Sequence, residues 1–310
     1  MVALKNFYKK FPDRIKVYWK KKKSSVLDIA VTACLLTLAA YIVYRLTVSL
    51  NYRWQWSIIP TYLIRFDPDS GRWVSNLLLQ GLHTTIKLSF WATLLAIILG
   101  LIMGLMRTSK RLLFRLVSGF YVELIRNTPP LVLVFIFYFF VSAQIIPKLG
   151  IEEFLRSGSE TTLQWARLLF AGPDMITAFV SGTITIALFQ GAYIAEIIRA
   201  GIESIERGQW EAAHALGFSR FQRMTYIILP QAIKRVLPPL ANEFINTIKY
   251  SSIVSIISIQ ELTFQGLQIM ASTNVTIEIW LTITLMYLVL CLLLSQASRF
   301  LEKNLTQRQF

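Results

Sequence analysis

This sequence is poor in the residues that enzymes use to bind metals and form disulfides. Its 310 residues include two cysteines and two histidines. Cys34 and Cys291 each lie in an apolar run, where a thiol packs as a small hydrophobic group, and neither belongs to a disulfide or metal motif. His83 and His214 are far apart and have no carboxylate grouping. We therefore expect no metal site and no zinc enzyme.

Signatures of several other protein classes are also missing. There is no Gly-Lys-Ser/Thr phosphate-binding loop, so the chain does not bind ATP in the P-loop manner, and we expect it to bind no cofactor of its own. No nucleophile stands with a base and an orienting group, which argues against a membrane enzyme. A filter-like segment and internal repeats with broken helices are absent too, which argues against a channel and an ion-coupled secondary transporter. The sequence nevertheless leaves open an ion-coupled secondary transporter, or another multi-span membrane protein that works without an ATPase partner.

Apolar residues, by contrast, are abundant. Hydrophobic residues make up 55% of the chain and aromatic residues 13%, while charged residues make up 16%. Soluble domains contain about 45–50% apolar residues, so this composition predicts an integral membrane protein. The net charge of +15 would suggest nucleic-acid binding in a soluble chain. Here the basic residues flank apolar runs, where they meet lipid headgroups, so we expect membrane lipid and no nucleic acid as partner.

Six apolar runs are long enough to cross a bilayer as helices, since a hydrocarbon core of about 30 Å needs about 20 residues. The fold class predicted is an all-α integral membrane protein with six transmembrane helices. They cover residues 27–48, 82–106, 117–141, 174–198, 236–259 and 276–300. The first run could also be the apolar region of a secretory signal, but it is long, its basic leader is extended and no cleavage site follows.

Basic residues indicate which ends of these helices face the cytoplasm. They cluster before the first run and after the second, fourth and sixth runs, so both termini and the segment between the fourth and fifth runs are expected inside. The organisation predicted is a basic cytoplasmic N-terminus (1–25), an N-terminal transmembrane helix (26–50), an external loop (51–80), a membrane domain (81–300) with a cytoplasmic loop (200–235), and a cytoplasmic tail (301–310). The external segments 49–80 and 143–173 are compatible with contacts to an external protein and with solvated connectors.

The cytoplasmic loop contains the most informative segment. The run from Gly208 to Gly217 is compatible with a short helix that has a packable edge of Ala212 and Ala213, and Gly217 supplies a stop where the backbone can adopt a positive φ. A second helix is expected to end before Gln231, at Leu229-Pro230. This protrusion suits docking to another protein. The simpler alternative is a solvated helix in a loop between two membrane spans.

The segment resembles the Glu-Ala-Ala loop of bacterial ABC-importer membrane subunits, in which Glu-Ala-Ala is followed by Gly and then Leu-Pro. Three further runs, 191–202, 126–130 and 248–252, narrow the resemblance to permeases for polar amino acids, of the histidine, glutamine or general L-amino acid type. The resemblance covers residues 80–300. It implies the type I importer (MetI-like) fold, here with an extra N-terminal helix. The coupling residues that it implies are Gly208, Glu211, Ala212, Ala213, Gly217, Leu229 and Pro230.

The resemblance also implies partners and a place in the cell. These are an ABC ATPase dimer that binds ATP and Mg²⁺, a second permease subunit, identical or homologous, and an extracytoplasmic amino acid binding protein. The chain itself would be a pore subunit without enzyme activity. It would lie in the bacterial cytoplasmic (inner) membrane and pass polar L-amino acids.

Polar residues inside the apolar runs form two helical stripes, and such residues normally face a partner or a wet cavity. One consists of Asn242, Asn246 and Lys249, with Ser252 close to it, and the other of Gln190, Tyr193 and Glu196. Lys249 and Glu196 offer opposite charges for a zwitterion. Glu196 is equally suited to an ion pair with Arg199, and Lys249 to neutralising a neighbouring helix.

Prolines and glycines mark special points in three runs. Asn127, Thr128 and Pro129 begin a segment that predicts either a broken helix, whose freed carbonyls a cavity or Asn127 could satisfy, or a helix start with Thr128 as N-cap and Pro129 in the first turn. Pro238 and Pro239 leave the same two possibilities. Gly100 and Gly104 form a Gly-x-x-x-Gly surface, which is typical of close helix packing.

Overall fold

The computed structural model describes residues 26–48, 52–69 and 71–307. It divides into two compact units, Met1–Trp54 and Gln55–Phe310. The predicted N-terminal segment 1–25 and the last three residues of the predicted tail lie outside the described residues.

The first unit contains one helix, α3 (Val26–Val48), among its described residues. It coincides with the first predicted run, and its 23 residues give a length of about 34 Å, enough to cross a hydrocarbon core. The hydroxyls of Thr32 and Thr37 donate to the carbonyls four residues earlier, Asp28 O at 2.7 Å and Ala33 O at 2.8 Å. Both hydroxyls are thus satisfied within the helix. That α3 is an additional span stays a prediction.

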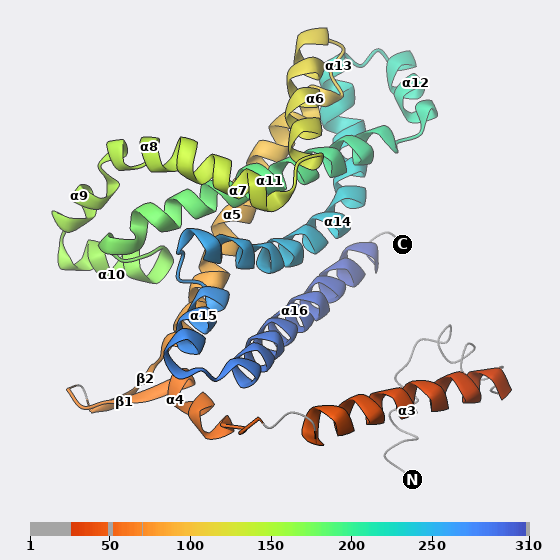
Figure 1. The fold of residues 1–310 in the computed structure, drawn as a ribbon. Coiled ribbons are helices and arrows are strands. Elements are labelled where there is room, and N and C mark those ends of the chain that lie inside the picture. The colour runs from red at the N-terminus through yellow and green to blue at the C-terminus, as the bar shows by residue number, and fades with distance from the viewer. Residues whose placement is uncertain (1–25, 49–51, 70, 308–310) are drawn as a thin grey trace. The chain divides into compact units, whose positions relative to one another are not determined.

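The second unit is mostly helical and has a small β-hairpin near its beginning (Figure 1). Its first elements are η1 (Trp56–Ile58), α4 (Ile59–Leu63), β1 (Ile64–Asp67), β2 (Arg72–Ser75), α5 (Leu77–Arg107), α6 (Leu112–Arg126), α7 (Pro130–Ile136), the π-helical turn η2 (Phe137–Ser142), α8 (Ala143–Ile145), η3 (Pro147–Leu149), α9 (Ile151–Arg156) and α10 (Glu160–Leu169). The remaining elements are α11 (Pro173–Glu203), α12 (Arg207–Ala215), α13 (Arg220–Gln222), the π-helical turn η4 (Arg223–Ile228), α14 (Leu229–Tyr250), η5 (Ser251–Ile257), α15 (Leu262–Thr273) and α16 (Thr276–Gln307).

Helices occupy all five runs predicted for this unit. Three stretches, containing α5, α11 and α16, are long and apolar enough to span a membrane without a sharp bend. The other two predicted spans are bent: α6 and the helix from Pro130 meet at 113°, and the helix ending at Ile257 meets α15 at 46°. Because α14 begins at Leu229, Pro238 and Pro239 lie inside this helix, so the expectation that they begin or break the span is wrong.

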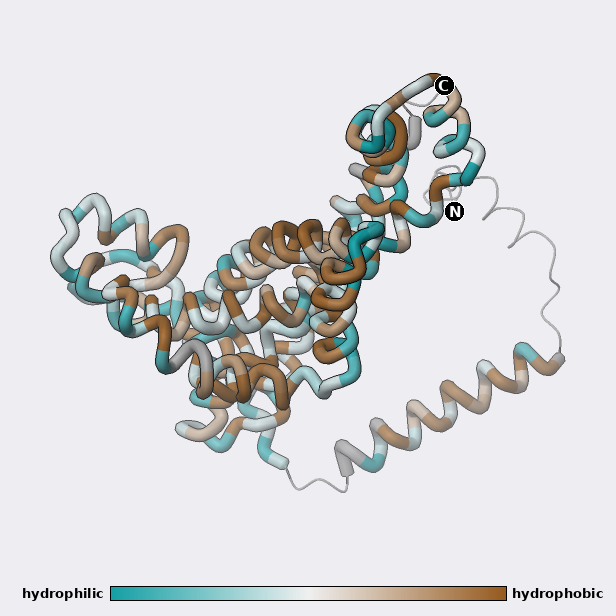
Figure 2. The backbone as a smooth tube through the Cα atoms, turned by 90° about the horizontal axis from the view of Figure 1, so that it is seen from above, coloured by the Kyte–Doolittle hydropathy of each residue, from teal (hydrophilic) through white to brown (hydrophobic). Residues whose placement is uncertain are grey.

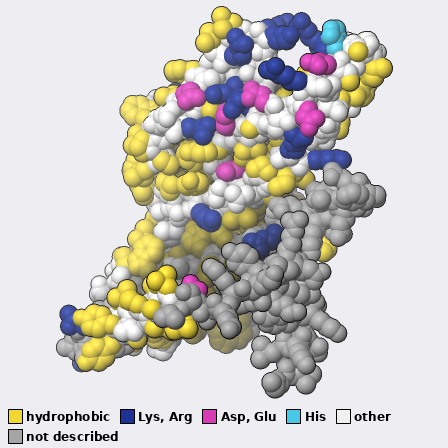
Figure 3. Space-filling view, turned by 90° about the vertical axis from the view of Figure 1, so that its right-hand side faces the viewer, with side chains coloured by type: hydrophobic (Ala, Val, Ile, Leu, Met, Phe, Trp, Pro, Cys, Tyr) yellow, Lys and Arg dark blue, Asp and Glu magenta, His cyan; other side chains and the backbone are white. Residues whose placement is uncertain are grey.

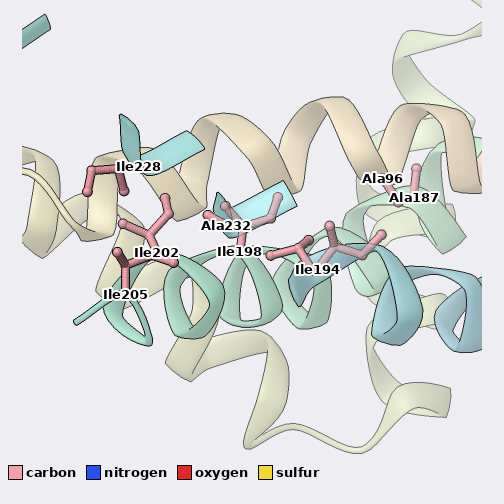
Figure 4. Packing of buried hydrophobic residues seen from close by; sticks show 9 residues of the cluster. Ala96, Ala187, Ile194, Ile198, Ile202, Ile205, Ile228 and Ala232 are labelled. Carbon is pink, nitrogen blue, oxygen red and sulfur yellow. The ribbon is translucent and has the colours of Figure 1, made fainter. Parts of the chain in front are cut away.

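Packing of α5 against α11 organises the second unit, and small residues permit it. A Cβ on Gly100 would lie 2.5 Å from Ile194 Cγ2, and one on Gly104 would lie 2.8 Å from the carbonyl oxygen of Ala195. The close packing predicted from the Gly-x-x-x-Gly pattern is therefore confirmed. A buried cluster joins this pair to η4 and α14 (Figure 4). Its members are Ala96, Ala187, Ile194, Ile198, Ile202, Ile205, Ile228, Ala232 and Val236.

Hydrophobic and charged residues are separated along the molecule. Hydrophobic residues predominate in the central helices, and paler or hydrophilic residues in many of the connections (Figure 2). In the space-filling view, charged side chains gather in the upper part of the face, at the height of α12 and α13 (Figure 3). This separation is typical of a protein that exposes one part to lipid and another to water.

Candidate functional site

The segment that resembles a Glu-Ala-Ala loop folds as a short helix, α12, at the end of α11 (Figure 1). Ala213 is buried and Trp210 packs against the cluster of Figure 4. Glu211 and Ala212 lie on the exposed side of the helix. The two alanines therefore do not form one edge: Ala213 holds α12 to its own chain, and Ala212 remains accessible.

Gly217 ends α12 in the way that its position predicted. Its φ is +77°, and its N–H donates to His214 O at 3.0 Å while the N–H of Phe218 donates to Ala213 O at 3.2 Å. This pair of bonds is a Schellman motif, which requires a left-handed residue after the helix. Gly208 lies in the first turn of α12, where a Cβ would meet no other atom within 4 Å.

The expectation that a second helix ends at Leu229-Pro230 is wrong. Ser219 caps α13 in a capping box with Gln222, and the chain continues through the π-helical turn η4 into α14 without a break. Leu229 begins α14, and Pro230 lies in its first turn, directly after the π-helical turn η4. The segment that contains α12 and α13 is therefore joined directly to the fifth predicted span.

The Asn127-Thr128-Pro129 segment breaks the third predicted span. Asn127 caps the end of α6, and its Nδ2 donates to Glu123 O at 2.8 Å. This carbonyl also accepts the backbone N–H of Asn127 and is not one that Pro129 or Pro130 frees, so the bond does not fulfil the predicted role of Asn127. The next helix starts at Pro130 with Pro129 as N-cap. Thr128 instead donates to Leu124 O at 2.7 Å, so its predicted role as N-cap is wrong. Both alternatives are thus partly realised, since a break is followed by a proline-started helix.

A buried polar cluster joins α11 to α14. Gln190 is completely buried, and its Nε2 donates to Thr247 Oγ1 at 2.9 Å and lies 3.2 Å from Glu243 Oε2. Its Oε1 is buried and accepts no hydrogen bond from the described residues. Asn246 Nδ2 donates to the other carboxylate oxygen of Glu243 at 3.2 Å. The two stripes therefore meet at Glu243, which the sequence analysis missed because it lies beside the Asn242–Asn246 row.

Tyr193 lies next to this cluster and faces the broken span. Its ring is 5.1 Å from that of Phe189, and the Arg126 guanidinium lies over it, 5.7 Å from its centroid. Phe189 also contacts Tyr250 at 5.2 Å. The end of α6, the middle of α11 and the end of α14 thus share an aromatic contact, and Arg126 gains the attraction of a cation for a ring.

Glu196 takes part in an ion-pair network instead of facing Lys249. It pairs with Arg199 on its own helix and lies 3.5 Å from Arg107 Nε. Arg107 also pairs with Glu123 at 3.0 Å. The network joins the ends of α5, α6 and α11 just before α12.

The remaining stripe residues lie apart from these contacts. Asn242 and Lys249 are exposed, and Ser252 donates to the carbonyl of Lys249 at 2.7 Å. Within the part of the chain that the structure describes, no ion pair joins Lys249 to Glu196. Among those same residues, no three His, Cys, Asp or Glu side chains come together in a way that could hold a metal ion.

Known proteins resemble this chain in both sequence and fold. Residues 96–307 match the family model described as binding-protein-dependent transport system inner membrane component. The probable glutamine ABC transporter permease protein GlnM of Bacillus subtilis is 34% identical over 230 residues, which are 74% of this chain and 94% of that protein. The glutamine transport system permease protein GlnP of Escherichia coli K12 is 34% identical over 74% of this chain and 93% of its own.

Solved structures give the same result. A crystal structure of an amino acid ABC transporter with histidines superposes with a TM-score of 0.59 at 35% identity, covering 74% of this chain and 94% of that one. An inward-facing structure of the MetNI methionine ABC transporter has a TM-score of 0.54 at 17% identity and supports the fold alone. The predicted helical importer fold and the resemblance to ABC transporter permeases are confirmed. The chain belongs to the family of inner membrane components of binding-protein-dependent transport systems.

Proposed function

We propose that this chain is the permease subunit of an ATP-driven importer of polar L-amino acids, coupled to a separate ATPase through α12. The observation that carries the proposal is the geometry of α12. One side, with Ala213, is fixed to the chain's own core, and the other, with Glu211 and Ala212, is exposed. The helix is held between the ends of α11 and α14, so a force on its exposed side reaches both.

The substrate class rests on the relatives. Two proteins 34% identical to this chain over more than nine-tenths of their length are named as glutamine permeases. A transporter structure at 35% identity is described with histidines. Glutamine is therefore the first substrate to test, and polar L-amino acids are the class.

The polar cluster around Gln190 supplies groups suited to such a substrate. The Glu243 carboxylate and the free acceptor of Gln190 match the donors of an ammonium or amide group, because buried polar groups require partners. We place the pathway along this cluster and the neighbouring groups. Its residues are Asn127, Thr128, Pro129, Gln190, Tyr193, Glu196, Asn242, Glu243, Asn246, Lys249 and Ser252.

The partners follow from the same proposal. The ATPase dimer binds ATP and Mg²⁺, a second permease subunit completes the pathway, and an extracytoplasmic binding protein delivers the amino acid. The chain lies in the bacterial inner membrane with both termini and α12 in the cytoplasm. An ion-coupled transporter is the competing function, and it needs no ATPase.

Uptake by the reconstituted complex tests the proposal. Proteoliposomes containing the permease, ATPase and binding protein should accumulate labelled glutamine with internal ATP and not with a non-hydrolysable analogue. Unlabelled amino acids should compete in order of their affinity for the transporter. Accumulation driven by a proton or sodium gradient in vesicles of the permease alone would refute the proposal.

A further inference from the structure

The hairpin that precedes α5 has two chemically different faces. In its register Phe66 lies opposite Trp73, and Ile64 lies opposite Ser75, so these side chains share one face. Trp73 is 71% exposed, Phe66 52% and Ile64 47%. The two aromatic rings contact each other edge to face at 5.7 Å between centroids, and this face is otherwise largely uncovered.

The opposite face carries charge. Arg65 lies opposite Val74, and Asp67 lies opposite Arg72. A two-stranded hairpin is marginally stable in water by itself, and exposed aromatic patches of this kind mark interaction surfaces. An apolar face backed by two arginines matches the border between lipid and water, where Trp lies at headgroup level and long basic side chains extend toward the polar phase.

The base of the hairpin is attached to the beginning of α5, and this attachment determines which end of the membrane span the hairpin lies at. The backbone N–H of Asn76 donates to Leu63 O at 2.8 Å, and its Nδ2 donates to Thr61 O at 2.6 Å. Ile59 in α4 is buried with Leu78 of α5, so the base of the hairpin is attached to the beginning of that helix. Since α5 begins at Leu77, directly after Asn76, the base lies where the apolar span begins.

The hairpin also turns away from the axis of α5 instead of continuing it (Figure 1). Its strands have four residues each, a length of about 14 Å. A short arm that leaves the end of a spanning helix sideways stays close to the bilayer surface.

We propose that this hairpin is a membrane-surface anchor, with the face of Ile64, Phe66 and Trp73 inserted at the lipid interface of the leaflet where α5 begins. It holds the outer end of α5, and through α4 also those of α15 and α16, at a fixed depth. The anchor is separate from the transport pathway and does not depend on the proposed substrate.

Site-specific fluorescence in the full complex tests the anchor. Single cysteines replace Trp73 or Phe66 on the apolar face, and Arg72 or Arg65 on the charged face as matched controls, in a Cys34→Ala/Cys291→Ala background. Each is labelled with the environment-sensitive dye NBD. The complex is reconstituted in vesicles of phosphatidylethanolamine and phosphatidylglycerol, with or without a lipid that carries a shallow nitroxide quencher.

Labels in Trp73→Cys and Phe66→Cys should show blue-shifted emission that the nitroxide lipid quenches, and labels in Arg72→Cys and Arg65→Cys should emit as in water. Two positions on each face keep the test independent of the loss of any one side chain. Water-like, unquenched emission from all four positions would overturn the proposal. So would protection of the apolar face by added binding protein in place of lipid.

Discussion

Replacing Gly217 by valine tests the role of the helix end most sharply. Gly217 has a φ of +77°, and a Cβ at this position would meet nothing within 4 Å. The cost of valine is therefore backbone strain and not a clash. A left-handed conformation costs an L-residue about 1–2 kcal/mol, and the cost for a β-branched residue such as valine lies at the upper end of this range. A loss of about 2 kcal/mol lowers the population of the closed turn, relative to the open turn, about thirtyfold.

Transport should fall accordingly, because α12 would no longer be held in one orientation toward the ATPase. We expect Gly217→Val to insert in the membrane at normal levels and to lose most ATP-dependent uptake in proteoliposomes. Gly217→Asn should keep most of the uptake, since asparagine tolerates the left-handed region.

Gly150→Val is the matched control. Gly150 has a φ of +64°, and a Cβ there would come no closer than 3.9 Å to another side chain, but it lies between η3 and α9. Its substitution should leave uptake unchanged. Normal uptake by Gly217→Val, or an equal loss in Gly150→Val, would refute the idea that the α12 turn couples the chain to its ATPase.

Two further predictions concern the interior. Gly104→Ala places a methyl group 2.8 Å from a backbone oxygen of α11 and should destabilise the protein by about 1–3 kcal/mol. Gly119→Ala is the control, because a Cβ there would meet nothing within 4 Å and should not destabilise the protein. Thermal unfolding of both variants in detergent would measure the difference. Equal melting temperatures would contradict the packing. Glu243→Ala removes the acceptor at the centre of the polar cluster and should raise the half-saturating substrate concentration for uptake about tenfold, equivalent to ~1.4 kcal/mol, with insertion intact. An unchanged concentration would exclude Glu243 from the pathway.

Much of the fold is visible in the sequence because it depends on long or locally decisive signals. Runs of about 20 apolar residues predict helices whatever their tertiary contacts. Gly217 and the Gly100–Gly104 pair act through the missing Cβ, and both predictions are confirmed. Asn127 was expected to satisfy a carbonyl that the prolines free, but it donates to Glu123 O, which also accepts the backbone N–H of Asn127.

The missed features depend on tertiary contacts or on atypical local signals. The sequence analysis did not anticipate α15, which follows a left-handed residue, Ser258, and has Glu261 as its N-cap, although neither residue type is the usual choice for its position. Thr85 of α5 supports this break by accepting the N–H of Leu262 at 3.1 Å, a contact across 177 residues. Leu229-Pro230 was taken for a helix end because proline commonly follows one. In the structure the helical backbone continues from α13 through η4 past this proline, so the proline does not end the helix.

Glu243 was missed for a different reason. A helical stripe groups residues three and four apart, and this grouping selected Asn242, Asn246 and Lys249. The structure turns the adjacent residue, Glu243, toward Gln190 of α11. A carboxylate within an apolar run is in itself a signal of function, and that signal was available in the sequence.

The sidedness and contact of α12 are the most direct test of the central claim. Ala212→Cys is exposed and Ala213→Cys buried, so the pair differs by one position on the same helix. A membrane-impermeant maleimide should label Ala212→Cys in inside-out vesicles and not in right-side-out vesicles, and bound ATPase should prevent the labelling; Ala213→Cys should react poorly in both. Labelling of Ala212→Cys from the outer face, or labelling that the ATPase leaves unchanged, would contradict the account.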